Sequence, residues 1–208
     1  MKTKLSLIKI NLAAAVALLC ITAASPLYSS ADLSISGSYL NAGDEGSLYG
    51  GGMIFSFDLE WLHIQENIHP FISAYYLGGM ENSGEKEEIS RSYIPVAGGV
   101  EYLRSLYGLP LSVKISGGGG AGYFRKEEPA RYGPFTDYSK TMSNSATAPF
   151  LFLNAGVQYT LSQRVALFLD AGYHYSFIKE EWMSDPFAGI QVNVGFRIAV
   201  AGMNRELE

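Results

Sequence analysis

FAGIQVNVGFRIAV, residues 187–200, alternates strictly between two kinds of side chain. Every even-numbered residue from Ala188 to Val200 is apolar, whereas the odd-numbered residues from Gly189 to Ala199 are small or polar. Successive side chains of a β-strand point to opposite faces, so this stretch is predicted to be a strand with one wholly apolar face. A helical stripe does not fit a two-residue period. The pattern leaves open whether the apolar face meets a protein core or a lipid bilayer.

The same two-residue period recurs throughout the chain from Asp32 onward. The connections between the periodic segments alternate between short ones and longer ones that carry most of the charge. This arrangement predicts an all-β fold, an eight-stranded antiparallel up-and-down barrel with tight turns at one end and larger loops at the other. The longest connection, 125–149, is interpreted as a mobile exterior loop or, alternatively, as a lid or ligand-contacting surface. The predicted strands are 32–40, 49–61, 71–79, 93–104, 111–124, 150–160, 165–177 and 187–200.

Periodicity fits both a lipocalin-like barrel with its apolar face inward and an outer-membrane barrel with that face in lipid. Three features favour the membrane barrel. The polar face is rich in small residues rather than lysine and glutamate, the apolar face carries no charge in mid-strand, and aromatic residues gather in two bands. Closure follows, because an open edge in lipid would leave backbone groups unsatisfied. The predicted membrane-interface aromatics are Tyr39, Tyr49, Trp61, Tyr75, Tyr102, Tyr123, Tyr159, Tyr175 and Phe196.

The N-terminal segment 1–31 has the pattern of a cleaved secretory signal peptide. It has three lysines before an apolar, alanine-rich stretch, and small-residue cleavage sites between Ala24 and Ala31. The one cysteine, Cys20, lies inside it, so the mature chain is expected to use no disulfide. The barrel is expected to occupy 32–200, followed by a short periplasmic tail at 201–208.

The net charge of −5, from 15 basic and 20 acidic residues, argues against a nucleic-acid partner. Charges on the polar face are expected to be bridged or hydrated inside the barrel, because an isolated charge there would be costly. Their role is interpreted as structural, although they also decide whether the lumen conducts. The predicted lumen-lining or ligand-binding residues are Asp58, Glu60, Glu101, Lys114, Asn154, Gln158, Asp170, His174, Gln191, Asn193 and Arg197.

Three other patterns suggest chemistry but are interpreted as structural. The glycine-rich run 116–122 lacks the lysine and hydroxyl residue of a phosphate loop, and a bend with aromatics over bare backbone is expected instead. The triplet His174–Ser176 is similar to the motif of outer-membrane lipid A 3-O-deacylases, but its parity places it in the lumen, hydrogen-bonded with Asp170. His63 and His69 flank a short turn and are expected to be solvated. We therefore predict no catalytic residue, no metal and no cofactor.

The closing segment resembles the OmpW-like family within the broader class of small OmpA- and OmpX-type barrels. Asp185-Pro186-Phe187 and then Gly195-Phe196-Arg197-Ile198 look like that family's last strand, with Ile198 at an aromatic position and the chain continuing beyond it. The segment is also similar to the C-terminal signal through which the barrel-assembly machinery recognises its clients.

The resemblance implies an outer-membrane location with loops exposed at the cell surface and lipids as neighbours. It further implies a narrow pore or binding conduit for small, hydrophobic molecules. The alternative is a non-conducting structural or adhesive barrel whose loops bind host or envelope components. Eight strands favour this alternative, because side chains fill so narrow an interior.

Overall fold

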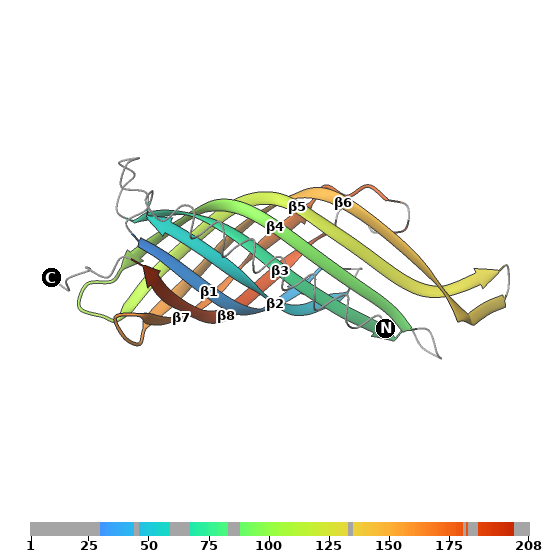
Figure 1. Ribbon diagram of the computed structural model, residues 1–208, viewed down its shortest axis with the longest axis horizontal. Helices are drawn as coiled ribbons and strands as arrows, with labels where there is room; N and C mark the ends of the chain where they lie inside the picture. Colours follow the sequence, from blue (N-terminus) through green and yellow to red (C-terminus); the bar gives the residue numbers. More distant parts are fainter. Residues whose placement is uncertain are drawn as a thin grey trace.

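The chain forms one closed antiparallel barrel in which each strand is hydrogen-bonded to the next and the last to the first (Figure 1). The computed structural model describes residues 30–43, 46–58, 67–82, 88–132, 135–180, 182 and 187–201. The predicted fold class is confirmed. The strands are β1 Ser30–Asn41, β2 Ser47–Asp58, β3 Ile68–Asn82, β4 Glu88–Ser105, β5 Leu111–Tyr132, β6 Phe135–Thr160, β7 Val165–Ser176 and β8 Phe187–Ala201.

β8 is the closing strand, and it lies between β1 and β7. Ile198 is opposite both Leu33 of β1 and Val165 of β7, and the pairing with β1 continues to Asn41 opposite Ile190. Because both sides of β8 are paired, the barrel has no open edge along this strand. The expected signal peptide up to residue 29 and the tail from residue 202 lie outside the described residues.

β5 and β6 form a long hairpin, which corrects the predicted loop at 125–149. Their pairing continues to Tyr132 opposite Phe135, with a bulge between Pro129 and Ala130. The neighbouring pairings stop much earlier, at Glu127 for β4 with β5 and at Phe150 for β6 with β7. The hairpin therefore projects as a two-stranded ribbon beyond the other strands (Figure 1). We call this end of the barrel the hairpin end and the opposite end the turn end.

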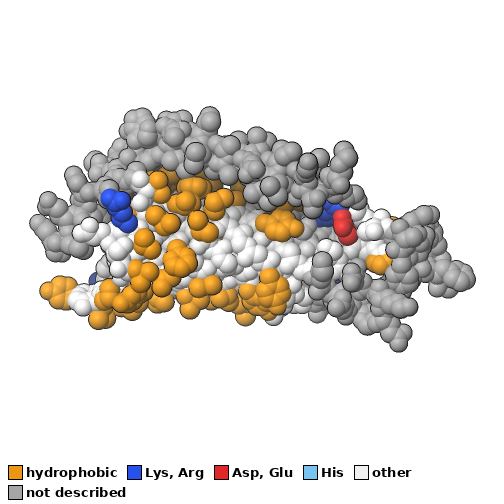
Figure 2. All heavy atoms as spheres, turned by 60° about the horizontal axis from the view of Figure 1, so that its bottom comes forward, with side chains coloured by type: hydrophobic (Ala, Val, Ile, Leu, Met, Phe, Trp, Pro, Cys, Tyr) orange, Lys and Arg blue, Asp and Glu red, His pale blue; other side chains and the backbone are white. Residues whose placement is uncertain are grey.

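The outer surface of the barrel is apolar over its middle. Figure 2 shows hydrophobic side chains spread over the face between the two ends. Among the described residues, no helix is long and apolar enough to cross a membrane. Exposed aliphatic residues on this outer face include Ile35, Ile72, Val96, Val100, Leu153, Val194 and Ile190.

Tyr75 faces the lumen, so its assignment to the membrane-interface band is wrong. It shares the inward parity of Ser73 and Leu77, which are buried, while its neighbour Tyr76 is 57% exposed on the outer face. Both faces of β3 carry aromatic residues, and alternation alone therefore does not distinguish them. The ring of Tyr75 lies over Gly52, where an added Cβ would come within 2.2 Å of the ring.

The glycine run in β5 lets two strands approach closely. A Cβ on Gly118, which points inward, would lie 2.3 Å from the carbonyl oxygen of Gly98 in β4, and one on Gly120 would lie 1.9 Å from that of Val96. Real side chains do not approach backbone so closely. The run is part of a continuous strand and not of a phosphate loop. The predicted covering of bare backbone by an aromatic side chain is found at Gly122, over which the ring of Tyr93 lies.

Substituting Gly118 with alanine is expected to lower the free energy of unfolding by about 1–3 kcal/mol, because the new methyl group must displace the β4 backbone. The control is Gly98→Ala on the facing strand, whose Cβ would point outward and meet its nearest atom at 3.8 Å. Urea unfolding of both variants in lipid vesicles measures the difference. Equal stability of the two would contradict the close strand approach.

Candidate functional site

Four charged side chains from four strands meet inside the barrel near its turn end. Lys114 of β5 lies 2.8 Å from Asp170 of β7 and 3.2 Å from Glu101 of β4, measured from Nζ to the carboxylate oxygens. Arg197 of β8 binds the other carboxylate oxygen of Glu101. All four residues are at most 5% exposed. Two cations and two carboxylates thus form a charge-balanced network across the lumen, here called the charge network.

Amide and hydroxyl groups complete the charge network. Asn193 donates from Nδ2 to Oδ1 of Asp170 at 2.7 Å, and its own Oδ1 accepts from Ser38 and Gln191. The guanidinium group of Arg197 also donates to hydroxyl groups of β1 and β2. A buried charged group needs such a set of hydrogen-bond partners to remain ionised. The network therefore places hydrogen-bonded polar side chains across the turn-end half of the lumen.

The hairpin-end half of the lumen is filled by an aromatic layer. Tyr93 is fully buried at its centre and stacks on Phe124 with ring centroids 4.1 Å apart. The rings of Phe150 and Phe187 lie edge-on to the ring of Tyr93, with centroid distances of 6.3 and 5.4 Å respectively. Aliphatic residues surround these rings. The buried cluster comprises Leu40, Ala42, Leu48, Leu77, Tyr93, Phe124, Ala148, Ile178 and Phe187.

His174 belongs to this aromatic layer and not to a network with Asp170. Its Nε2 is 2.8 Å from the hydroxyl of Tyr93, and its ring stacks on Phe150 at 4.6 Å. Among the described contacts, Asp170 binds Lys114 and Asn193 instead. The predicted bond between the two groups is therefore wrong. No acid orients the imidazole in these contacts, so they do not assemble a nucleophile, base and acid.

A cavity of about 30 Å³ lies between the two layers. Its wall combines aromatic side chains such as Phe152 and His174 with polar groups such as Lys114 and Asn154. The side-chain oxygen of Asn154 has no hydrogen-bond partner in the described chain. A volume of this size holds one or two water molecules, and a water there would satisfy that oxygen. It is too small for an organic ligand.

The remaining predicted lumen residues are distributed as follows. Asn154, Gln158 and Gln191 are each 6–7% exposed and have inward parity. The side chain of Asp58 and all of Glu60, Trp61 and His63 lie outside the described residues. His69 is 7% exposed, so the expectation that it is solvated is wrong.

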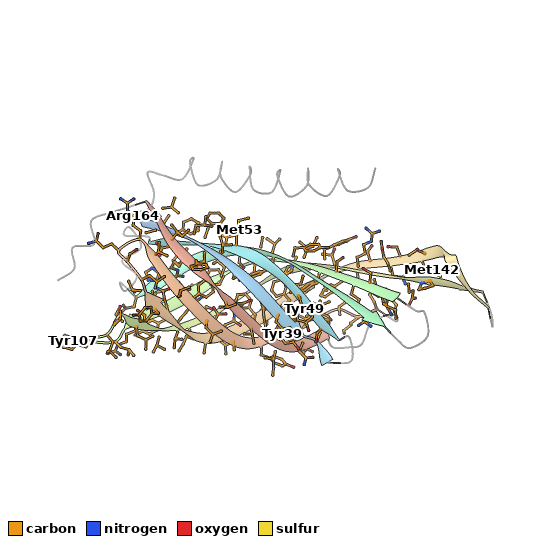
Figure 3. All side chains as sticks on the ribbon, turned by 90° about the horizontal axis from the view of Figure 1, so that it is seen from below. Tyr39, Tyr49, Met53, Tyr107, Met142 and Arg164 are labelled. Atoms are coloured by element: carbon orange, nitrogen blue, oxygen red, sulfur yellow. The ribbon has the colours of Figure 1, made fainter. Side chains whose placement is uncertain are left out.

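The other predicted interface aromatics lie on the outer side of their strands. Tyr39 and Tyr49 contact each other with centroids 5.1 Å apart, and both lie near the hairpin end (Figure 3). Tyr49, Tyr123, Tyr159 and Phe196 are 40–61% exposed, whereas Tyr39, Tyr102 and Tyr175 are half-buried.

The aromatic layer was not predicted from the sequence as a unit. A signal was present in the sequence, because Tyr93 has the same parity as Glu101 and Phe150 has the same parity as Asn154. Large aromatics on the polar face of several strands indicate a filled lumen rather than a hydrated one. Finding that they meet required the register between strands.

The projecting hairpin carries polar and charged side chains. Arg125 forms an ion pair with Glu127, and its Nε donates to the hydroxyl of Ser143 at 3.1 Å. Lys126 lies 3.5 Å from Glu128. Met142 is 48% exposed on the ribbon (Figure 3). This surface can bind a partner by hydrogen bonds.

No family model matches the sequence, and no curated protein matches it. Solved structures do match. The attachment invasion locus protein Ail of Yersinia pestis is 17% identical, with 81% of this chain and 97% of Ail covered and a TM-score of 0.50. A major outer membrane protein of Thermus thermophilus is 12% identical, with 82% of this chain and 99% of that protein covered and a TM-score of 0.55.

The fold is that of the small outer-membrane barrels. At these identities the similarity concerns the fold alone. Membership of the OmpW-like family stays a prediction.

Proposed function

We propose that this protein is an outer-membrane barrel that does not conduct and that binds macromolecular partners outside the cell through the β5–β6 hairpin. The hairpin carries this proposal, because its two strands continue well past the last pairing of their neighbours. A ribbon held on a rigid barrel presents its backbone and side chains away from the membrane. The barrel then serves as an anchor for this recognition element.

A membrane location is supported by the outer surface. Apolar residues such as Val100, Leu153 and Val194 are 55–63% exposed there, which in water would form an extensive exposed apolar surface. A bilayer removes that cost and requires a closed barrel, which this chain forms.

The closed lumen supports an anchoring role over a pore. Ions crossing it would have to displace both the charge network and the aromatic layer. The pore for small hydrophobic molecules implied by the OmpW resemblance needs a wider path than a cavity of about 30 Å³. Ail, a protein of the same fold, is named for attachment, which agrees with the adhesive alternative.

The test replaces residues 125–145 with Asn-Gly, which joins the paired residues Phe124 and Ala146 by a tight turn. We expect the shortened protein to remain folded and to lose binding of bacteria carrying it to extracellular-matrix proteins. Both proteins are also expected to give no conductance steps in planar bilayers.

The control is Tyr107→Ser at the opposite end of the barrel (Figure 3). It should leave binding unchanged. Full binding by the shortened protein, or stepwise conductance by the unaltered one, would disprove the proposal.

A further inference from the structure

The two strands of the projecting hairpin differ in how their outer edges are protected. The free edge of β5 begins at Glu128 and contains Pro129 and the bulge that follows it. Charge, proline and a bulge are the devices that prevent an edge strand from pairing with another chain. On β6, the stretch TMSNSATA, residues 141–148, has no charge and no proline. We call this stretch the β6 edge.

The backbone of the β6 edge points its hydrogen-bonding groups outward at alternate residues. The carbonyl of Pro149 accepts from Phe177 on the β7 side, whereas the N–H of Thr160 donates to Pro110 on the β5 side. Backbone groups of an antiparallel strand alternate between its two neighbours. Odd-numbered residues of β6 therefore direct N–H and C=O away from β5. On the β6 edge these are Thr141, Ser143, Ser145 and Thr147, and no described strand lies on that side.

We propose that the β6 edge binds an extended, uncharged segment of another protein as an added antiparallel strand. This inference rests on the proposed function and names its mode of binding. Four residues with outward N–H and C=O groups supply a ladder of backbone hydrogen bonds, which is the basis of strand addition. Register on β6 would be limited by Pro149 at one end and by the bulge at the other.

The side chains beside the edge determine which partner fits. Ser143, Ser145 and Thr147 are small, exposed and of outward parity. On the paired strand, Arg125 and Glu127 form an ion pair with each other. Along 143–147, an added strand therefore meets the hydroxyl groups of these outward-facing residues. Threonine, serine and valine at alternate positions of the partner would match this surface.

A second copy in the same membrane does not fit this edge. Copies related by rotation about the membrane normal keep the direction of β6, so two such edges would meet in parallel. Parallel pairs are slightly less stable and occur where both faces of a sheet are buried. The ribbon is instead exposed at Thr141, Met142 and Ser143. The occupant is therefore a foreign strand in antiparallel orientation.

The direct test uses hydrogen exchange of the full-length protein in nanodiscs with a short peptide of alternating threonine and valine. Binding should slow exchange of the amides of Ser143, Ser145 and Thr147. The same peptide N-methylated at alternate residues should not. If the amides of 141–148 exchange equally with and without the peptide, the inference is wrong.

Matched variants separate backbone from side-chain recognition. Ser145→Pro removes an edge N–H without removing a bond to β5, and it should weaken binding to the peptide and to matrix proteins about tenfold. Ser145→Ala keeps the N–H and should bind as the unaltered protein does. Unchanged binding by Ser145→Pro, with binding lost on replacing 125–145, would reject strand addition and leave the proposed function standing.

Two further outcomes are informative. Unchanged matrix binding after both changes would reject the proposed function itself. Efficient cross-linking between the β6 edges of copies in one nanodisc would show that the occupant is this chain.

Discussion

Replacing Lys114 with methionine is expected to lower the free energy of unfolding by about 3–5 kcal/mol. The ammonium group is within 3.2 Å of carboxylates of both Glu101 and Asp170, and its side chain is 3% exposed. Removing it leaves two buried acids and one cation, Arg197, which pairs with Glu101. Urea unfolding in lipid vesicles, followed by tryptophan fluorescence or gel mobility, measures the loss.

Two controls identify the cause of this loss. Arg125→Gln breaks an exposed ion pair on the hairpin and should cost at most about 1 kcal/mol. Adding Asp170→Asn to Lys114→Met restores charge balance and should recover part of the lost stability. A Lys114→Met protein as stable as the unaltered one would mean that the charge network is not required for folding.

Replacing Tyr93 with alanine is expected to cost about 3–5 kcal/mol, because it removes the ring at the centre of the aromatic layer. The side chain is fully buried, stacks on Phe124 and binds His174. The lost ring also uncovers Gly122, whose backbone it touches. The same unfolding measurement applies.

A graded series tests this assignment. Tyr93→Phe keeps the ring but removes the hydroxyl that binds the imidazole of His174. We expect this change to lower the free energy of unfolding by about 1–3 kcal/mol. Tyr107→Ala at the exposed turn should change stability by less than about 0.5 kcal/mol. If Tyr93→Ala and Tyr107→Ala were equally stable, the hairpin-end half of the lumen would not be a packed core.

Within the described residues, the predicted strands with one clearly apolar face coincide with observed strands, whereas residues 59–61 of the second predicted strand lie outside the described part of the chain. The bounds of β7 and β8 each lie within one residue of the predicted ones, because alternation continues along their whole length. The prediction failed for 125–149, where both faces of the hairpin are polar and the two-residue period disappears. Cross-strand hydrogen bonds and the continuing pairing form that hairpin without a hydrophobic signal.

The odd or even position of a residue in its strand correctly predicted whether most side chains point inward or outward, but it was insufficient for others. Glu101, Lys114 and Arg197 are buried on the inward side of strands whose other face is apolar. Tyr75 lies on a strand with aromatics on both faces, so its direction depends on what it meets on the neighbouring strand β2. Its ring covers the bare backbone of Gly52 in β2, so the sequence of β3 alone does not reveal its direction.

By itself the sequence determined the closed eight-stranded architecture, because a two-residue period with one apolar face demands a sheet buried against lipid or core along its length. The tertiary structure decided which inward groups meet. Asp170 pairs with Lys114 rather than His174, since register and barrel curvature, and not spacing along one strand, bring their atoms to 2.8 Å. Curvature and register likewise bring the rings of the aromatic layer together, and in the described residues no strand pairs with 141–148 on the side away from β5.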